Sequence, residues 1–409
     1  MMDQRDVLFL CQFFYPEYNS SATLPWDTAE YLAKSGLKVG AMCGYPREYN
    51  MSGKVPTKEV KNGVFIKRLR YIQLKREKKL ARLVNYFSFT LSVLLHIREL
   101  KKYKIVIVYS NPPILPMATI LAKAIYHTKI VFVSFDVYPE IAYASGNLAA
   151  NGMIAKIMRY LNRKLFAKVS TVVALTDEMK DFLLTNRSTL SKDRVTVIPN
   201  WAHEARCLKD QATYSKFGYS KDDFIVSYFG NMGICQDMET IIQAIELLKE
   251  NNHIKFFIIG HGSKKEYVIE KTKELNNVQV LDFLTGREFE QAVSISSCSI
   301  VSLERGLRGM CAPSKYYSYL QDGIPVISVV EKDSYLAKEI IYEEIGKFVE
   351  NGEGRRLAEE IKKIAEDKDL SQKMAVKAQR LYIEKYEKNK CLDKYVMLLK
   401  DLMEIDSGK

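Results

Sequence analysis

Residues 224–262 have the sequence FIVSYFGNMGICQDMETIIQAIELLKENNHIKFFIIGHG, in which two apolar runs flank one amphipathic stretch. The runs at 224–229 and 255–259 have the length of buried strands, and residues 238–250 between them have the periodicity of a helix. Each run is followed by a turn that contains glycine: Gly230-Asn231-Met232-Gly233 and Gly260-His261-Gly262-Ser263. A strand, a helix and a second strand in this order predict a Rossmann-like unit with a parallel, doubly wound sheet.

The same alternation of strands and helices extends to both sides of this stretch. Further strands are expected at residues 7–14, 38–43, 105–109, 129–135, 171–175, 195–198, 278–281, 299–303 and 326–330. Residues 202–222 are polar and weakly patterned, as a connection between two domains would be. The sequence therefore predicts an α/β protein with two Rossmann-like domains, residues 1–205 and 206–384. Residues 370–402 have the pattern of one long, charged helix.

The composition fits a globular protein of two domains. The chain has 409 residues, of which 47% are hydrophobic, so each half can bury a core of its own. Its seven cysteines form no C-x-x-C pair, so the sequence suggests neither a zinc site nor a disulfide framework, and we expect no bound metal. The first residues lack the layout of a signal peptide, and we expect a cytoplasmic protein.

The positive charge is concentrated in the first half. The net charge is +12, and the first 200 residues carry about twice as many basic as acidic residues, whereas the remainder is slightly acidic. Such an asymmetry indicates a polyanionic partner, either nucleic acid or an anionic membrane. No nucleic-acid-binding motif is recognisable, so a basic protein that binds nucleic acid is the weaker alternative.

A basic run followed by an uncharged stretch favours the membrane. Lys67–Arg82 contains eight basic residues and one acid, Glu77, and Leu83–Ile97 has no charged residue. These 15 residues are shorter than the ~20 that span a bilayer, so we expect Lys67–Ile97 to attach to the surface of an anionic membrane. The alternative is a core helix of the first domain preceded by a solvated basic loop.

The candidate site residues follow the predicted strands, because ligands of open parallel sheets bind at the carboxyl ends of the strands. The two glycine turns after residues 229 and 259 allow backbone N–H groups to approach a phosphate. A third segment, Pro313-Ser314-Lys315, opens a helix with a lysine, which the helix dipole disfavours unless an anion lies between them. The alternatives are ordinary strand-to-helix turns and an exposed lysine.

In the first half, Asp136 follows a strand and Glu140 lies one helical turn further on. Asp136 is a candidate catalytic acid or base, and a helix cap is the alternative. The loop after the first strand, which contains Glu17, Asn19, Ser20 and Ser21, is expected at the same sheet edge. We assign Glu17, Asn19, Ser20, Ser21 and Glu140 to the acceptor side.

Several short motifs together resemble family 4 of the retaining GT-B glycosyltransferases over essentially the whole chain. The motifs are Phe14-Tyr15-Pro16-Glu17, Asn111-Pro112-Pro113, Asp136-Val137-Tyr138-Pro139-Glu140, Ile198-Pro199-Asn200-Trp201, Gly230-Asn231-Met232-Gly233, Pro313-Ser314-Lys315 and Asp322-Gly323-Ile324-Pro325-Val326. The chain looks most similar to the branch that builds O-antigen and capsular polysaccharide, including N-acetylfucosamine transferase-like members.

The resemblance implies two domains facing across a cleft, with a final helix, residues 385–409, that crosses back to the first domain. It implies a nucleotide-sugar donor, usually a UDP-sugar, in the second domain and no further cofactor. The implied donor-binding residues are Gly230, Asn231, Gly233, Gln236, Gly260, Gly262, Phe283, Leu284, Pro313, Ser314 and Lys315. Lys315 would also stabilise the charge of the leaving diphosphate during transfer.

The implied activity is transfer of a hexosyl or N-acetylhexosaminyl group, with retention, to a saccharide acceptor. That acceptor can be linked to a polyprenyl diphosphate, which would place the enzyme at the inner face of the cell membrane. The chain departs from the family pattern at Met310 and Ser318, where many members have glutamate, and near Gln236, where a basic residue is usual. A nucleotide-sugar epimerase of similar architecture is the main enzymatic alternative.

Overall fold

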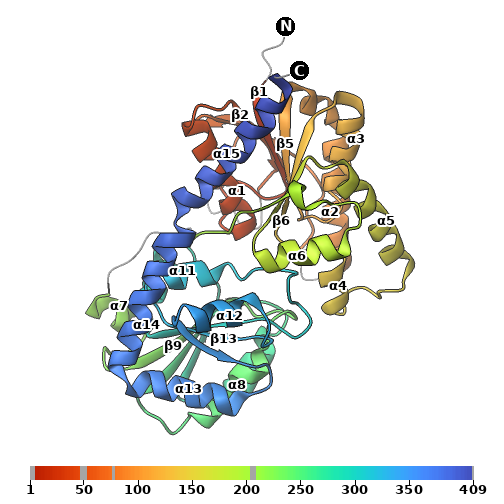
Figure 1. Cartoon of the computed structure of the whole chain (residues 1–409). Helices are drawn as coiled ribbons and strands as arrows, with labels where there is room; N and C mark the ends of the chain where they lie inside the picture. The colour runs from red at the N-terminus through yellow and green to blue at the C-terminus, as the bar shows by residue number, and fades with distance from the viewer. Residues whose placement is uncertain (1–4, 47–52, 76–78, 203–208, 408–409) are drawn as a thin grey trace. The chain divides into compact units, whose positions relative to one another are not determined.

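The computed structural model describes residues 5–46, 53–75, 79–202 and 209–407. The chain divides into two compact units (Figure 1). Unit 1 comprises residues 1–199, 309–312 and 389–409, and unit 2 comprises residues 200–308 and 313–388. Both units are α/β structures built on a largely parallel sheet, as the sequence predicts.

Unit 1 contains a sheet with the strand order β3-β4-β2-β1-β5-β6-β7-β8. Every neighbouring pair is parallel except β3 and β4 at one edge. Residues 7–11 of β1 are all buried, which is usual where helices cover both faces of a parallel sheet. The strands are β1 (Arg5–Cys11), β2 (Val39–Gly44), β3 (Lys58–Lys61), β4 (Val64–Leu69), β5 (Tyr103–Tyr109), β6 (Lys129–Ser134), β7 (Thr171–Ala174) and β8 (Val195–Val197).

The helices of unit 1 pack on its sheet. Phe89 of α2, Ala118 of α3, Phe166 of α5 and Leu183 of α6 belong to one buried core cluster, so these helices share it. Tyr31 of α1 donates a hydrogen bond to Asp393 of α15 at 2.6 Å, which joins the last helix to this unit. The helices are α1 (Ser20–Lys34), α2 (Lys79–Leu95), α3 (Pro116–Tyr126), α4 (Glu140–Ala144), α5 (Met153–Lys168), α6 (Asp177–Asn186) and α15 (Lys388–Ser407), with 3-10 turns at Ile97–Lys102 and Lys192–Arg194.

Unit 2 contains a parallel sheet with the order β11-β10-β9-β12-β13-β14. The strands are β9 (Phe224–Asn231), β10 (Ile254–His261), β11 (Val278–Leu281), β12 (Cys298–Ser302), β13 (Val326–Val329) and β14 (Gly346–Val349). The helices are α7 (Gln211–Lys216), α8 (Met238–Leu247), α9 (Lys265–Thr272), α10 (Gly286–Ser294), α11 (Lys315–Gln321), α12 (Tyr335–Tyr342), α13 (Gly354–Glu366) and α14 (Lys368–Leu381). A π-helical turn, Tyr382–Tyr386, follows α14.

The long helical stretch predicted at residues 370–402 is divided into α14, the π-helical turn and α15. The helical path is interrupted by the π-helical turn and by Glu387, whose ψ of 133° is not helical. Tyr386 in this turn donates to Glu339 of α12 at 2.6 Å, so the chain is tied to unit 2 directly before it enters unit 1. In the described part of the chain, no helix has both the length and the apolar composition needed to cross a bilayer.

Candidate functional site

The two glycine motifs of unit 2 are register partners in adjacent strands. Gly230 pairs with Gly260, and Asn231 pairs with His261, because β9 and β10 each continue past the end of the predicted apolar run. A Cβ atom on Gly260 would lie 1.8 Å from the carbonyl oxygen of Gly230, so no larger residue fits there. The two motifs therefore form one narrow backbone platform at the carboxyl edge of the sheet.

Beyond the strands, the two turns are joined by hydrogen bonds. The Met232 N–H donates to the His261 carbonyl at 2.6 Å, and the Lys264 N–H donates to the Met232 carbonyl at 2.7 Å. Gly262 has a φ of +139°, and a Cβ atom there would lie 2.4 Å from the Met232 oxygen. Close backbone approach thus explains the second glycine turn as well as the first.

Gln236 closes the first turn on itself. Its side-chain oxygen accepts a hydrogen bond from the Gly233 N–H at 3.0 Å, and its carbonyl accepts from the Lys264 ammonium at 2.8 Å. The sequence analysis assigned Gly233 and Gln236 to the binding site of the nucleotide-sugar donor. In the structure they bond to each other, so the Gly233 N–H would have to exchange partners to reach a phosphate.

Lys315 lies beside this platform. It begins α11 after Pro313 and Ser314, and a Cβ atom on Gly230 would lie 3.9 Å from its Cγ. Its ammonium stands 3.9 Å from the centre of the Phe289 ring, a cation–π distance. Burial, and then the charges of Lys315 and Lys265, lower the pKa of His261. The glycine platform, Lys315 and His261 are therefore brought together at one sheet edge.

Buried tyrosines fix the start of α11. The Tyr319 hydroxyl accepts a hydrogen bond from the Phe229 N–H at 3.0 Å, and Tyr316 donates to Glu339 at 2.7 Å. Ser318, one of the two positions where the family pattern has glutamate, is buried in the same helix. On the other side of the platform, Phe283 packs edge-on against His261, with ring centres 5.1 Å apart. Leu284 follows it and is partly buried.

Lys264 and Glu304 also belong to this region, although sequence reasoning did not select them. The Lys264 ammonium lies 3.0 Å from Glu239 and 3.4 Å from Glu304, and its side chain is 19% exposed. Carboxylate oxygens of Asp237, Glu239 and Glu304 lie within 4.8 Å of one another, a spacing that could hold a cation. These carboxylates already have partners: Lys264 pairs with Glu239 and Glu304, and Asp237 accepts the N-cap hydrogen bond of the Thr240 N–H at 3.0 Å. Lys264 could have been identified from the sequence by its position as a basic residue directly after the second glycine turn.

Asp136 is held at the end of β6 in unit 1. Its N–H donates to the Ser110 hydroxyl at 3.0 Å, and its backbone forms a bridge with Cys311 of the segment 309–312. The adjacent Val137 N–H donates to the Met310 carbonyl at 2.8 Å, so Met310 contributes a backbone contact at this position. Burial raises the pKa of Asp136 to about 6, which suits a group that exchanges a proton near neutral pH.

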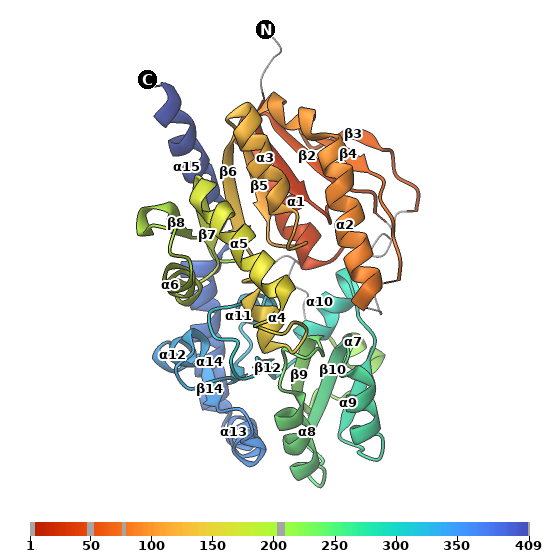
Figure 2. The same ribbon diagram turned by 90° about the vertical axis from the view of Figure 1, so that its right-hand side faces the viewer.

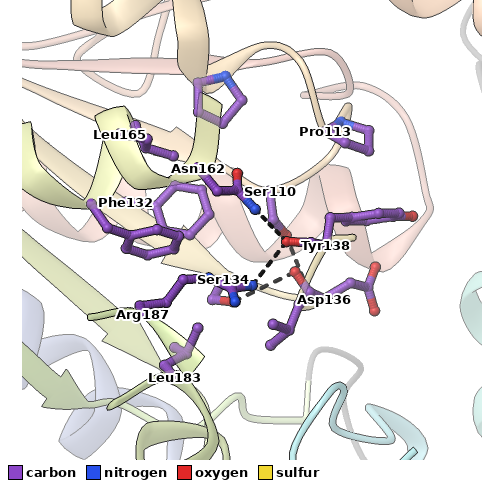
Figure 3. A pocket seen from close by; sticks show the side chains of 13 residues that line it. Ser110, Pro113, Phe132, Ser134, Asp136, Tyr138, Asn162, Leu165, Leu183 and Arg187 are labelled. Carbon is purple, nitrogen blue, oxygen red and sulfur yellow. Dashed lines mark hydrogen bonds between the residues drawn. The ribbon is translucent and has the colours of Figure 1, made fainter. Parts of the chain in front are cut away.

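A pocket adjoins Asp136. Polar groups line it together with apolar side chains of β6, α5 and α6 (Figure 3). Asn162 and Arg187 both donate to the Tyr138 carbonyl, at 2.6 and 3.0 Å. Arg187 also forms two bonds to the Glu140 carboxylate, at 2.7 and 2.6 Å, and is 7% exposed. The structure thus places Glu140 in an ion pair that ties α4 to the end of α6.

The loop after β1 carries unpaired polar atoms. Within the described residues, neither polar atom of the Asn19 side chain has a hydrogen-bond partner, and the same holds for Gln12 Oε1 and Asn111 Oδ1. Glu17 is buried, and Ser20 and Ser21 begin α1. Buried polar atoms are usually paired, so these groups mark a place where a ligand could supply hydrogen bonds. Gln12 was not selected from the sequence.

Comparison with known proteins adds independent findings. Residues 22–201 match the glycosyl transferase 4-like domain, and residues 210–381 match the glycosyl transferases group 1. The chain is 26% identical over 257 residues to "Probable glycosyltransferase WbjE" of Pseudomonas aeruginosa, a match that spans 61% of this chain and 63% of that protein. It is 22% identical over 291 residues to WcaI of Escherichia coli, which is named for colanic acid biosynthesis. That match spans 68% of this chain and 69% of WcaI.

Among solved structures, HepE from Anabaena in complex with UDP-glucose superimposes with a TM-score of 0.71 at 14% identity. The match covers 97% of this chain and 100% of that chain. At this identity the likeness concerns the fold.

Proposed function

Because the chain is built from the two domains of a GT-B glycosyltransferase, we propose that it transfers a sugar from a UDP-sugar to a saccharide acceptor. The observation that carries this proposal is the pairing of Gly230 with Gly260 beside Lys315 in unit 2. Gly230 is partly exposed at this edge of the sheet, and the lysine supplies positive charge, which together suit a diphosphate. The UDP-glucose complex of the HepE neighbour supports a donor whose base is uracil.

In this proposal unit 2 stabilises the leaving group. Negative charge grows on the diphosphate as the bond to the sugar breaks, and a fixed ammonium at that point lowers the barrier. The Phe289 ring and the tyrosine-anchored α11 hold Lys315 in place before substrate arrives. Phe283 and Leu284 are proposed to lie against the base.

Unit 1 is proposed to bind the acceptor. Asp136, with its pKa raised to about 6, would be largely ionised at neutral pH and able to accept the proton of an acceptor hydroxyl. The unpaired Nδ2 of Asn19 would donate to a phosphate or saccharide oxygen, and Oδ1 of Asn19 and of Asn111 would accept from saccharide hydroxyls. We further propose that the configuration at the anomeric carbon is retained.

The relative named for colanic acid biosynthesis supports a role in the synthesis of a cell-surface polysaccharide, of the O-antigen or capsular kind. We propose an acceptor carried on a polyprenyl diphosphate, since the basic and apolar segments of unit 1 suit an enzyme at a membrane surface. Whether the sugar is a hexose, an N-acetylhexosamine or N-acetylfucosamine is a matter for a donor screen.

A ligand screen followed by a transfer assay tests the proposal. A ligand that binds only the native state raises the unfolding temperature, so uridine nucleotides should do so and adenine nucleotides should not. The responding UDP-sugar is then incubated with polyprenyl-diphosphate saccharides, and products are identified by mass spectrometry. The absence of any shift with uridine nucleotides would refute the donor assignment. Isomerisation of the UDP-sugar without transfer would indicate an epimerase.

A further inference from the structure

Helix α2 has an apolar stripe on each of two faces. Phe89 and Val93 are fully buried in the core of unit 1, and Asn85 beside them is 4% exposed. A second stripe is open to solvent, with side chains between 48% and 77% exposed: Leu80, Leu83, Phe87, Leu91 and Leu95. Their spacing of three and four residues places them along one side of the helix. A surface helix normally has a polar outer face, so this second stripe calls for a partner.

The exposed apolar surface continues onto the neighbouring helices. Helix α3 lies between α2 and α5 (Figure 2), and it adds Leu121 and Ile125. Helix α5 adds four further exposed residues, Met153, Ile154, Ile157 and Tyr160. Of the 24 large apolar side chains that are exposed in the described part of the chain, 11 lie on these three helices. Because scattered exposed apolar residues are normal, it is this concentration that marks a binding surface.

The same three helices are basic and contain no acidic residue. Helix α2 contributes Lys79 and Arg82, and α3 contributes Lys123. Helix α5 contributes five more: Lys156, Arg159, Arg163, Lys164 and Lys168. Burial, followed by the charges of Lys168, Arg194 and Lys129, lowers the pKa of Lys123, as expected where cations crowd together. The nearby Glu99 is already paired with Lys67 and Lys102, at 3.1 and 2.8 Å.

The segment before α2 is fixed along this surface. The Asn85 side chain bonds to both backbone groups of Leu74, at 2.8 and 2.9 Å, and the Ser88 hydroxyl accepts from the Ile72 N–H at 3.2 Å. Ile72 and Leu74 are themselves 55% and 47% exposed. These bonds hold the flanking basic residues Arg70 and Lys75, both exposed, close to the apolar stripe.

We propose that the outer face of α2, α3 and α5 docks on an anionic phospholipid bilayer. Its apolar side chains enter the boundary between headgroups and acyl chains, and its lysines and arginines contact the phosphates. A second copy of the chain fits poorly, because a two-fold dimer through this face would oppose like charges. This proposal deepens the membrane-associated sugar transfer proposed above, and it rests on that proposed function. It extends the contact from the Lys67–Ile97 segment to α3 and α5.

Vesicle sedimentation with matched variants tests the proposal. The full-length protein is mixed with vesicles of phosphatidylcholine and phosphatidylglycerol in equal parts, or of phosphatidylcholine alone. One variant combines Leu83→Gln, Phe87→Gln and Leu91→Gln, and a second combines Met153→Gln, Ile154→Gln and Ile157→Gln. Glutamine preserves helix propensity, and these side chains are exposed, so folding should persist. The control variant changes three equally exposed residues of unit 2: Ile341→Gln, Tyr342→Gln and Val376→Gln.

Wild type and the control should sediment with the anionic vesicles, and each test variant should bind about 10-fold or more weakly. Binding of the second variant at the wild-type level would show that α5 is not part of the membrane-binding surface. Equal losses in all three variants, or no wild-type binding at low salt, would overturn the proposal. Thermal stabilisation by UDP is measured on the same samples, with a melting curve as the folding control. If UDP still binds, failure at the vesicles leaves the proposed transferase activity standing.

Discussion

Lys315→Met removes the positive charge at the glycine platform and keeps most of the side-chain stem. Lys315 packs beside Gly230, where we place the diphosphate, and the scale of the effect follows if one of its oxygens lies about 4 Å from the ammonium. At that distance and an effective dielectric constant of about 20, one pair of unit charges attracts by about 4 kcal/mol. Loss of a single charge-stabilising group from a reacting site typically lowers kcat by about 10²- to 10³-fold. We expect a loss of that size.

The assay is steady-state transfer from the responding UDP-sugar, with UDP affinity measured by calorimetry. Lys271→Met is the matched control, since its ammonium also lies over an aromatic ring, 6.0 Å from Tyr267, on an exposed part of α9. The control should retain wild-type kcat and UDP affinity. A Lys315→Met enzyme with unchanged kcat and unchanged UDP affinity would show that the platform does not hold the leaving group.

Three further predictions concern groups whose environment is fixed by the structure. Burial raises the pKa of Asp136 to about 6, so ionisation of this carboxyl destabilises the folded state as pH rises from about 4 to above 6. Asp136→Asn removes this effect. The unfolding free energy of the variant, relative to wild type, should therefore be higher at pH 8 than at pH 4 by up to about 3 kcal/mol. If chemical denaturation gave the same difference in unfolding free energy at both pH values, this prediction would be contradicted. An unchanged kcat of Asp136→Asn at pH 8 would show that Asp136 is not the catalytic base. Gly260→Ala should abolish UDP binding and lower the melting temperature far more than Gly218→Ala, which meets no atom within 4 Å and carries only the strain of a φ of +77°; equal shifts would refute the steric argument. Glu140→Gln should lower the unfolding free energy by about 3–5 kcal/mol, because it leaves the Arg187 charge buried and uncompensated, and a neutral result would show that the pair is dispensable.

The sequence predicted most strands of the two sheets and missed β3, β4 and β14, of which β3 and β14 are edge strands. Runs such as 105–109 are continuously apolar, because a strand in the middle of a parallel sheet is buried on both faces. Strand β3 has no such run: three of its four residues are exposed, and it pairs antiparallel at the edge. Strand β14, Gly346–Val349, has only two apolar residues among its four, so it lacks the apolar run that identified other strands of this length.

In the site, local motifs were predictable and partners distant in sequence were not. The glycine turns and Lys315 could be located from their neighbours in sequence, but the register that pairs Gly230 with Gly260 depends on how far each strand extends. The contact of Lys264 with Glu304 joins residues 40 positions apart, on loops that follow different strands. Likewise, the ion pair of Glu140 with Arg187 could not be predicted, because the two residues lie 47 positions apart in the sequence.

Helix α2 shows why composition alone could not choose between the two interpretations of the uncharged stretch. A core helix and an interfacial helix were treated as alternatives, yet Phe89 and Val93 are buried while Phe87 and Leu91, two positions earlier in each case, are exposed. Both stripes are apolar, so the hydrophobic periodicity identifies no polar face and cannot say which side meets the sheet. Only the packing against β4 and α3 makes that assignment, and it leaves the outer stripe, flanked by basic residues, as the part of the helix that protein contacts do not explain.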